Sequence, residues 1–411
     1  MKKYDEYKDS GVAWIGDVPN HWEVIKLKYK YHFQTGATPN TGKKENFEGD
    51  LRWANISDLN GSVVYDTTKH INKEAASKCS MNISPKGSLM YSFKLSVGTV
   101  AFCGEDMYTN EAIASFIPQK NDLKYLFYCA PIFIIHNANR NIYNAPLLNQ
   151  ELIKNALICL PSLNEQTAIA TYLDTHCAKI DNLISIQQKR IALLQELKQS
   201  VITHAVTKGL NPNVEMKQSG VEWIGDVPKH WELVRTRYLC NLCTGSKDTI
   251  NRVDDGKYPF YVRSPKVERI DTYSFDGEAI LMAGDGVGAG KVFHYAVGKF
   301  DYHQRVYNFH NFKHVLGKFF YNYISNNFKY IIEEGGAKNT VDSVRLYMIQ
   351  NFMTTVPPLE EQMEICNYIE QKEKVFDTSI SNAQHQIELL QEYKQSLITE
   401  VVTGKRKVTD N

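Results

Sequence analysis

The sequence predicts a mixed α/β protein of two tandem halves, each with an α+β body followed by a long helix. Three observations support this fold class. A long helical segment occurs twice, a shorter segment occurs twice at another spacing, and the two bodies share turn positions but few side chains. Because the long segments repeat only after 196 residues, as Leu163 and Leu359 show, the chain is a pair of domains and not a solenoid.

The repeated long segments occupy residues 160–208 and 356–404. Each opens with the pattern Pro-x-Leu-x-Glu-Gln, at 161–166 and 357–362, and neither has a Pro or Gly inside its helical pattern. Apolar residues recur at spacings of three and four, as on one face of a helix. They are Ile169, Leu173, Ile180, Leu183, Leu194, Leu197 and Val201, and then Ile365, Ile369, Phe376, Ile380, Ile387, Leu390 and Leu397.

Each segment therefore predicts one helix, ~68 Å long at ~1.5 Å per residue, which ends near Gly209 or Gly404. A narrow apolar stripe with charged flanks requires a partner helix, and the other copy is the natural partner. The alternative is two unrelated surface helices, which the close repeat disfavours.

The second repeat lies at residues 10–23 and 219–232, both of which contain Trp-Ile-Gly-Asp-Val-Pro. Its offset is 209 residues, so the segment is duplicated together with each body. We therefore predict five parts in chain order. They are a first domain (1–159), a first long helix (160–208), a second domain (209–355), a second long helix (356–404) and a tail (405–411).

The two bodies share a pattern of turns. Residues 86–90 followed by Gly98 resemble residues 276–281 followed by Gly288, although the side chains differ. We expect a buried helix over 123–135, a polar loop over 137–148, and an aromatic-rich helix over 312–334. Shared turns with divergent side chains indicate one fold that recognises two different things.

Composition limits the class of protein. The 411 residues have a formal net charge of +1, which does not indicate nucleic-acid binding. If the chain binds DNA, its basic residues are locally clustered or a partner assists. No apolar run is long enough to span a bilayer, and the start does not read as a signal peptide. Eight scattered cysteines fit reduced thiols and a cytoplasmic location.

No motif of an enzyme is complete. The glycine-rich segment 283–292 lacks the first Gly and the final Ser or Thr of a phosphate loop, so a tight turn between strands is expected. Cys240 and Cys243 form a lone CxxC, which we interpret as two small buried residues. His310 and His314 have no third ligand. Residues 144–147 lack the second Pro and the aromatic residue of a methyltransferase tetrad, and no nuclease cluster is found.

The candidate DNA contacts are polar side chains in the loops of the bodies. Their fixed donors and acceptors match phosphates and base edges. Taken one at a time, each also fits a solvated surface charge, and only the duplicated setting favours the functional interpretation. They are Lys43, Lys44, Arg52, Arg140 and Asn141 in the first body, and Arg263, Lys266, Lys291, His303, Gln304, Arg305, Lys338 and Asn339 in the second.

The chain resembles the specificity subunits of type I restriction–modification systems over essentially its whole length. The resemblance rests on the two Pro-x-Leu-x-Glu-Gln openings with their helices and on the segment from Leu193 to Glu232. It implies two target-recognition domains, each reading one half of a bipartite asymmetric DNA site. It also implies an antiparallel coiled coil that fixes the distance between the half-sites.

The resemblance further implies partners. Methyltransferase subunits, usually two, dock on the helices and recognition domains, and motor–nuclease subunits join them. Those partners use S-adenosylmethionine and ATP with Mg²⁺, whereas this chain is expected to bind no cofactor or metal and to catalyse nothing. The expected partner contacts on the long helices are Glu165, Gln166, Leu194, Leu197, Glu361, Gln362, Leu390 and Leu397. Two alternatives stay open, a coiled-coil adaptor with two protein-binding domains and an enzyme that depends on a metal or nucleotide.

Overall fold

The structure is a computed structural model that describes residues 3–118, 122–334 and 343–408, without the side chains of residues 333 and 334. The chain divides into two compact units. Unit 1 comprises Met1–Ile186 and Gln386–Asn411, and unit 2 comprises Gln187–His385. Within the described ranges, no helix has both the length and the apolar character needed to cross a membrane.

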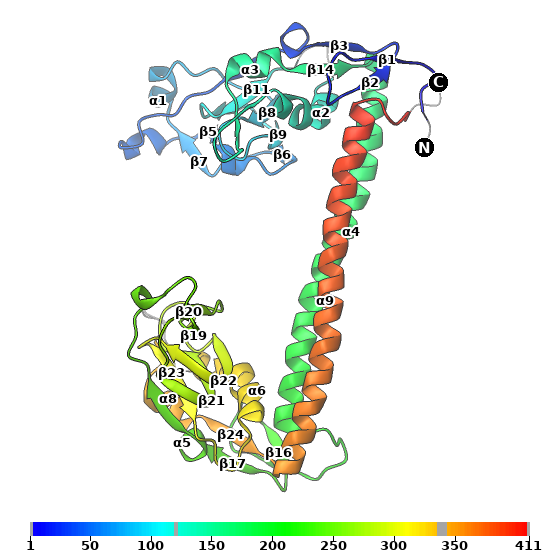
Figure 1. The fold of residues 1–411 in the computed structure, drawn as a ribbon. Helices are drawn as coiled ribbons and strands as arrows, with labels where there is room; N and C mark the ends of the chain where they lie inside the picture. The colour runs from blue at the N-terminus through cyan, green and yellow to red at the C-terminus, as the bar shows by residue number, and fades with distance from the viewer. Residues whose placement is uncertain (1–2, 119–121, 335–342, 409–411) are drawn as a thin grey trace. The chain divides into compact units, whose positions relative to one another are not determined.

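Each unit holds one α/β body and one part of each long helix. The two helices are α4 (Leu163–Lys208) and α9 (Leu359–Val402), and their segments lie side by side within each unit (Figure 1). The sequence predicted both helices, and their starts and ends fall within a few residues of the predicted ones. The mixed α/β fold class with two long helices is therefore confirmed.

The body of unit 1 is built on two sheets. The larger has the order β4 (Phe33–Thr35), β11 (Ile113–Phe116), β8 (Leu89–Ser92), β9 (Val100–Cys103) and β6 (Val63–Val64). The smaller has the order β10 (Tyr108–Thr109), β5 (Leu51–Ala54) and β7 (Lys69–Ile71). The paired strands are β1 (Tyr7–Asp9) with β2 (Asp17–Pro19), β3 (Glu23–Lys26) with β14 (Leu157–Leu160), and β12 (Asn139–Arg140) with β13 (Pro146–Leu147). The helices are α1 (Lys73–Lys78), α2 (Leu123–His136) and α3 (Gln150–Asn155), with 3-10 turns η1 (Leu27–Tyr29), η2 (Lys44–Phe47) and η3 (Ile56–Asp58).

The body of unit 2 is built on one sheet of six strands. Its order is β18 (Asn241–Thr244), β23 (Val306–His310), β21 (Phe275–Ala283), β22 (Phe293–Tyr302), β19 (Tyr258–Tyr261) and β20 (Glu268–Ile270). The paired strands are β15 (Met216–Gln218) with β16 (Asp226–Pro228), and β17 (Glu232–Arg235) with β24 (Met353–Val356). The helices are α5 (Thr236–Leu239), α6 (Gly317–Asn327), α7 (Lys329–Glu334) and α8 (Leu346–Asn351), with the 3-10 turn η4 (Thr249–Asn251).

One helix of each body lies between the sheet and the long helices. In unit 1 this is α2, whose Tyr128 hydroxyl donates to Asp174 of α4 at 2.6 Å. In unit 2 it is α6, which lies beside the long helices in Figure 1. The helix predicted over 123–135 is thus confirmed.

The helix predicted over 312–334 is wrong at its start and in its continuity, because it begins only at Gly317 and divides at Phe328. The backbone N–H of Leu316 donates to the Gln362 side-chain oxygen at 2.7 Å, which holds the chain extended just before the helix.

The apolar stripe of the long helices is buried in each unit where a body covers it. In unit 1, Leu173 and Ile180 join a core that contains Leu397 of α9. In unit 2, Val206 joins a core that contains Ile369. Burying one such side chain contributes about 1.5–3 kcal/mol. Other members of the predicted stripe are half exposed, among them Leu183 at 47% and Leu197 at 52%.

The helix segments run antiparallel in both units, and the same ion pair fixes their register twice. In unit 1, Lys394 Nζ lies 2.7 Å from Asp181 Oδ1. In unit 2, Lys198 Nζ lies 2.8 Å from Asp377 Oδ1. The offset of 196 residues converts each pair into the other. The sequence repeat therefore reproduces the contact between the helices, and the interpretation of two unrelated surface helices is wrong.

A buried glutamine fastens each long helix to its own body. Gln362 donates to the carbonyl oxygens of Pro357 and His314, at 2.8 and 3.1 Å, while its own oxygen accepts from Leu316. In unit 1, Gln166 donates to the Pro161 carbonyl at 2.9 Å. Both side chains are almost fully buried. The Pro-x-Leu-x-Glu-Gln pattern thus encodes a joint between body and helix.

The neighbouring glutamates complete the joint differently in the two units. Glu361 accepts from Trp231 Nε1 at 2.9 Å and contacts His230 Nε2 at 2.8 Å. Glu165 instead accepts from the Tyr4 hydroxyl at 2.6 Å and contacts His21 Nε2 at 3.0 Å. The indole N–H of Trp22, the counterpart of Trp231, is buried and has no hydrogen-bond partner among the described residues.

This difference predicts unequal effects of one substitution. Trp231→Phe should lower the free energy of unfolding by about 1 kcal/mol more than Trp22→Phe, because only Trp231 gives up a hydrogen bond to a carboxylate. Urea unfolding of the full chain measures both values. The loss of ring volume is the same in the two variants, so it cancels in the comparison. Equal losses would show that the Trp231–Glu361 bond contributes no net stability.

Candidate nucleic-acid interface

The glycine-rich segment 283–292 is a turn between the antiparallel strands β21 and β22. A phosphate loop instead joins a strand to a helix. The prediction of a tight turn between strands is therefore confirmed. Gly284 N donates to the Arg305 carbonyl and Val344 N donates to the Gly284 carbonyl, both at 2.8 Å. Two neighbouring segments thus hold the start of the turn in place.

Asp285, in this turn, lies between two of the predicted DNA contacts. Its Oδ1 accepts from Arg263 Nη1 at 2.9 Å, and its Oδ2 lies 3.6 Å from Arg305 Nε. Arg263 comes from the segment after β19, whereas Arg305 comes from the turn between β22 and β23. Three segments that are distant in sequence thus bring two guanidinium groups to one carboxylate.

The neighbouring residues of the β22–β23 turn have different environments. Gln304 is exposed and donates from Nε2 to Asp248 Oδ2 at 2.8 Å. His303 is buried, and its Nδ1 accepts from the backbone N–H of Arg305 at 2.9 Å. Burial, and then the nearby charge of Arg263, lower the pKa of His303. A neutral His303 therefore supports the backbone of Arg305, while Gln304 faces solvent.

The remaining predicted contacts of unit 2 do not join this cluster. Lys266 is exposed, with its Nζ 3.7 Å from Glu268 Oε1. Lys291 is exposed at the far end of the glycine-rich turn. Lys338 and Asn339 lie outside the residues that the structure describes.

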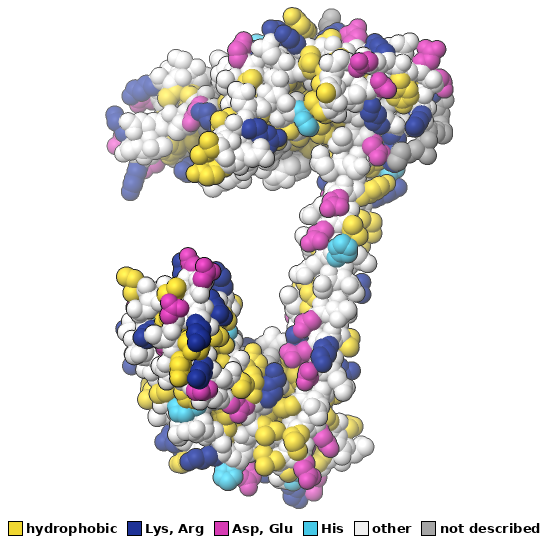
Figure 2. All heavy atoms as spheres, in the orientation of Figure 1, with side chains coloured by type: hydrophobic (Ala, Val, Ile, Leu, Met, Phe, Trp, Pro, Cys, Tyr) yellow, Lys and Arg dark blue, Asp and Glu magenta, His cyan; other side chains and the backbone are white. Residues whose placement is uncertain are grey.

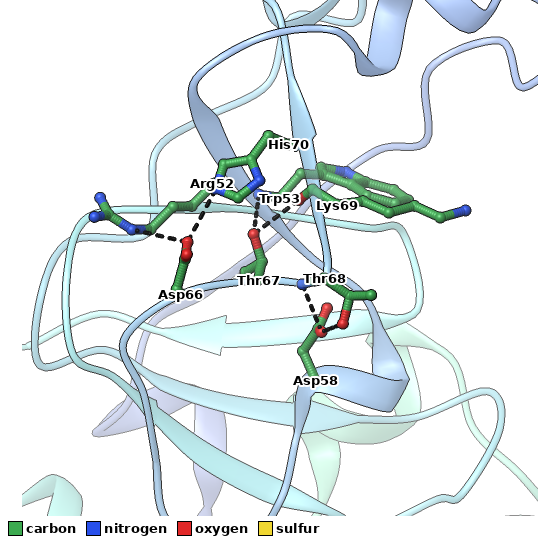
Figure 3. Close-up of polar contacts among 8 residues, drawn as sticks. All are labelled: Arg52, Trp53, Asp58, Asp66, Thr67, Thr68, Lys69 and His70. Carbon is green, nitrogen blue, oxygen red and sulfur yellow. Dashed lines mark hydrogen bonds and ion pairs between the residues drawn. The ribbon is translucent and has the colours of Figure 1, made fainter.

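In unit 1, Arg52 on β5 belongs to a cluster with Asp66 and His70 (Figure 3). Arg52 Nε lies 3.5 Å from Asp66 Oδ1, and His70 Nε2 lies 2.9 Å from the same oxygen. A backbone hydrogen bond from Thr67 and then the hydrogen bond with His70 outweigh desolvation and lower the pKa of Asp66. One carboxylate again organises a basic side chain at the surface.

The turn that carries Asp66 is fixed by side chains on both sides of it (Figure 3). Thr67 Oγ1 accepts from the Trp53 backbone N–H at 3.0 Å and donates to the Lys69 carbonyl at 2.7 Å. Asp58 accepts the backbone N–H of Thr68 at 3.0 Å. These hydrogen bonds therefore fix the turn that places the Asp66 carboxylate beside Arg52.

The other predicted contacts of unit 1 are spread over two further loops. Lys43 and Lys44 are exposed at the start of η2. Arg140 lies on β12, and its Nη1 donates to the Asn144 carbonyl at 3.0 Å. The side-chain oxygen of Asn141 accepts two backbone N–H groups, from Tyr143 and Ala145, both at 2.9 Å. Asn141 thus shapes its own turn, and the structure does not bring Arg140 to Arg52.

The expected polar loop over 137–148 contains the short β-hairpin of β12 and β13, and its tip is apolar, so the prediction of a polar loop is wrong at the tip. Ile142 is 91% exposed and Tyr143 is 84% exposed, although both side chains are large and apolar. Asn144 takes a left-handed conformation with φ 61°. The sequence signal was present, because Asn on either side of two residues is typical of a tight turn.

The two bodies place corresponding turns on the same backbone scaffold. Phe93 N donates to the Ala112 carbonyl at 2.9 Å in unit 1, as Gly284 N does to Arg305 in unit 2. Arg305 therefore corresponds to Ala112. Beside Ala112, the carboxylate of Glu111 lies 3.9 Å from Lys94 Nζ. The same position in the fold carries different charges in the two units.

Acidic and basic side chains are interspersed over the visible face of each body (Figure 2). This distribution agrees with the net charge of +1. The structure provides two local clusters of candidate DNA contacts, around Asp66 and around Asp285, without an excess of positive charge.

The cysteine and histidine pairs do not form a metal site. Cys240 is buried as expected, but Cys243 is exposed, so the expectation of two buried thiols is wrong for Cys243. Its Sγ lies 3.2 Å from the Tyr302 hydroxyl. His310 lies on β23 and His314 beyond it. Among the described side chains, no three His, Cys, Asp or Glu residues converge as metal ligands.

The residues expected to contact partner subunits fall into two groups. Glu165, Gln166 and Gln362 are buried in the joints, and Glu361 is bonded to Trp231 and His230 there. Gln166 and Gln362 are almost fully buried, whereas Glu165 keeps a small exposed surface at the wall of a surface pocket. Leu397 is buried as well, whereas Leu194 and Leu390 are half buried and Leu197 is exposed.

The buried imidazole of His303 predicts acid sensitivity. Its pKa in the folded state lies below the unfolded value of about 6.5. The unfolded chain therefore takes up the proton first, and stability falls as the pH drops from about 6.5 through the folded pKa, by at most about 1.4 kcal/mol per pH unit.

His303→Asn keeps an acceptor but removes the titration, so the acid-side loss should shrink. Urea unfolding of both chains between pH 7.5 and 4.5 measures this effect. Identical pH profiles would assign the acid sensitivity to another group.

Comparison with known proteins identifies the repeated architecture. The family model "Type I restriction modification DNA specificity domain" matches residues 19–196 and again residues 228–389. The chain is 26% identical to the type I restriction enzyme MjaIX specificity subunit of Methanocaldococcus jannaschii over 264 residues, which are 62% of this chain and 60% of that protein. It is 26% identical to the EcoDI specificity subunit of Escherichia coli over 44% of this chain and 40% of that protein.

The match spans less than two thirds of each of these two relatives. A longer alignment joins the chain to the putative MjaX specificity subunit of M. jannaschii, at 24% identity over 96% of both proteins.

Solved structures share the fold. A chain from a structural study of complex assembly and conformational transition in the type I R-M system aligns with a TM-score of 0.71 at 14% identity, over 94% of this chain and 98% of that one. The HsdS subunit from Thermoanaerobacter tengcongensis aligns with a TM-score of 0.50 at 15% identity, over 95% and 98%. Because the family model covers most of both repeats, the chain belongs to the type I restriction modification DNA specificity family and carries two copies of its domain.

Proposed function

We propose that this chain is the DNA-specificity subunit of a type I restriction–modification complex, in which each body reads one half of a bipartite, asymmetric DNA target. One observation carries the proposal. Two copies of one specificity domain hold corresponding turns through the same backbone hydrogen bond. The side chains of these turns differ, because unit 2 has Arg305 and Asp285 where unit 1 has Ala112 and Lys94. Equal scaffolds with unequal side chains suit two unequal half-sites.

The candidate contacts divide by chemistry into two sets. Exposed lysines and the hairpin arginine suit phosphates, which position a protein without reading sequence. These are Lys43, Lys44, Arg140, Lys266 and Lys291. Guanidinium and amide groups held at fixed positions suit base edges in the major groove. These are Arg52, Arg263, Gln304 and Arg305, while Lys338 and Asn339 remain candidates from sequence alone.

The paired long helices serve, in this proposal, as a spacer and as a docking surface. Leu193 and Leu197 are exposed on α4. At the offset of 196 residues, they correspond to Leu389 and Tyr393 on α9, which are also exposed. Their exposed fractions are 64% and 52% on α4, and 50% and 51% on α9. Two matched apolar pairs suit two copies of one partner, which we assign as methyltransferase subunits. Motor–nuclease subunits complete the complex.

The chain itself is non-catalytic and binds no cofactor in this proposal. S-adenosylmethionine, ATP and Mg²⁺ belong to the partner subunits. The location we assign is the cytoplasm, where the DNA target lies.

The proposal is tested by mapping methylated bases. Long-read sequencing is applied to a host that expresses this chain with its methyltransferase, and to the same host without this chain. A split motif that is methylated only when the chain is present is the expected result. If methylation is independent of the chain while both proteins assemble, the chain has no role in DNA specificity, and the adaptor alternative takes its place.

The docking surface gives a separate prediction. Leu193→Glu with Leu197→Glu should remove one methyltransferase copy, because two carboxylates must then lose water at an apolar contact. Leu389→Glu with Tyr393→Glu should remove the other copy, and all four changes together should remove both.

Native mass spectrometry of the complex counts the copies. Gln195→Glu with Gln199→Glu is the matched control, since it adds equal charge at neighbouring exposed positions. Unchanged copy numbers in every variant would place the docking surface elsewhere.

A further inference from the structure

We infer that unit 2 recognises a guanine through the pair Arg263 and Arg305, one of which makes the bidentate contact, and that Asp285 is the positioning residue that holds both guanidinium groups. This inference rests on the proposed function and gives one of its half-sites a chemical identity. It is carried by the arrangement of the three side chains and by what surrounds them.

The backbone fixes the positions of Asp285 and Arg305 relative to each other. The turn that carries Asp285 donates a hydrogen bond from Gly284 N to the carbonyl of Arg305 itself, at 2.8 Å. Asp285 also forms a β-bridge with Ser343 on its other side. The carboxylate therefore meets the arginine from a turn that is bonded on two sides, so little conformational entropy remains to be lost on binding.

The two arginines keep free donors after they bind Asp285. A guanidinium has five N–H groups, of which each arginine commits one nitrogen to the carboxylate. Arg305 is engaged through Nε, which leaves the N–H groups on its two terminal nitrogens for another ligand. The side chain of Arg305 is 65% exposed and that of Arg263 is 44% exposed. Both can therefore reach a ligand without leaving Asp285.

Arg269, in the same unit, shows what a structural arginine looks like. Its Nε donates to the Gly256 carbonyl at 2.8 Å and its Nη2 donates to the Lys257 carbonyl at 3.0 Å. Over the described ranges, neither Arg263 nor Arg305 has a side-chain hydrogen bond to a backbone carbonyl. Asp285 holds both side chains, and their other N–H groups remain available to a ligand. This arrangement suits a residue that contacts DNA and not one that only stabilises the fold.

The carboxylate of Asp285 makes a base a more favourable ligand of the two arginines than a DNA phosphate. A phosphate that approached both arginines would also approach Asp285, and the like charges would repel. The O6 and N7 atoms of guanine are two neutral acceptors on one edge, and they match two N–H groups of one arginine. The cluster therefore favours a guanine edge in the major groove over the DNA backbone.

Unit 1 provides an internal control. Ala112 occupies the position that corresponds to Arg305, so unit 1 has no arginine for the same contact at this position. A change in the cluster should alter one half of the methylated motif and leave the other half unchanged.

The test measures binding by the complex with its methyltransferase to duplexes that carry the mapped motif. Replacing the recognised guanine by 7-deazaguanine removes N7 only and should weaken wild-type binding. Arg305→Ala and Arg263→Ala should lower discrimination at one guanine, by roughly 5- to 150-fold for a bidentate contact. The variant that loses the bidentate contact should no longer respond to 7-deazaguanine at that position.

Asp285→Asn keeps the size of the side chain but frees both arginines for phosphates. Discrimination at the guanine should fall, while non-specific binding and the slope of log K against log salt should rise, the slope by about 1 to 2. A merely structural role for Asp285 would lower thermal stability without steepening the salt slope.

Arg252→Ala is the matched control, because Arg252 is similarly exposed and also lies beside acidic residues. It should leave both half-sites unchanged. If Arg263→Ala, Arg305→Ala and Asp285→Asn all keep the wild-type motif and its discrimination at the guanine, the inference is overturned. The proposed function would stay intact. Absence of any chain-dependent motif in the wild type would instead defeat the proposed function.

Discussion

The attachment of each body to the long helices depends on one buried amide at the first turn of each helix. Leaving a buried amide group without a hydrogen-bond partner costs about 1–3 kcal/mol. In unit 1, Gln166 Nε2 donates to the Pro161 carbonyl, while its side-chain oxygen has no partner among the described residues. In unit 2, Gln362 avoids this cost, with Pro357, His314 and Leu316 as partners. The joint therefore ties together the helix, the strand before it and the start of α6.

Repetition of the joint allows one protein to carry two bodies with the same scaffold and different surface side chains. The same scaffold bond, from Phe93 to Ala112 in one body and from Gly284 to Arg305 in the other, leaves the side chains of these turns free to differ. Surface positions of this kind contribute little to folding, so they can change without loss of the fold. In unit 1 and in unit 2, a carboxylate organises a basic group, as Asp66 does for Arg52 and Asp285 for Arg263. A short ion-paired cluster can give selectivity without a large excess of positive charge.

Much of the fold followed from the sequence, because repeats and helical periodicity depend on residue order alone. Both long helices were predictable in this way, and so was the buried helix α2. The roles of Glu165 and Gln362 were not, because a polar residue at a helix start gives no sign of whether a body covers it. The apolar tip formed by Ile142 and Tyr143 was missed because exposure is a property of the folded chain. The clusters around Asp66 and Asp285 depend on strand pairing between distant segments, which no local pattern reports.

The most direct test of this account is to shorten both long helices together and to map the methylated motif. Deleting residues 186–192 from α4 and 382–388 from α9 removes one matched heptad from each helix, ~10 Å of length, and preserves both Lys–Asp pairs. If the helices set the spacing between two independent readers, the gap between the half-sites should shorten by about three base pairs and both half-site sequences should stay the same. A change in the bases of either half-site, with the original gap retained, would contradict the account.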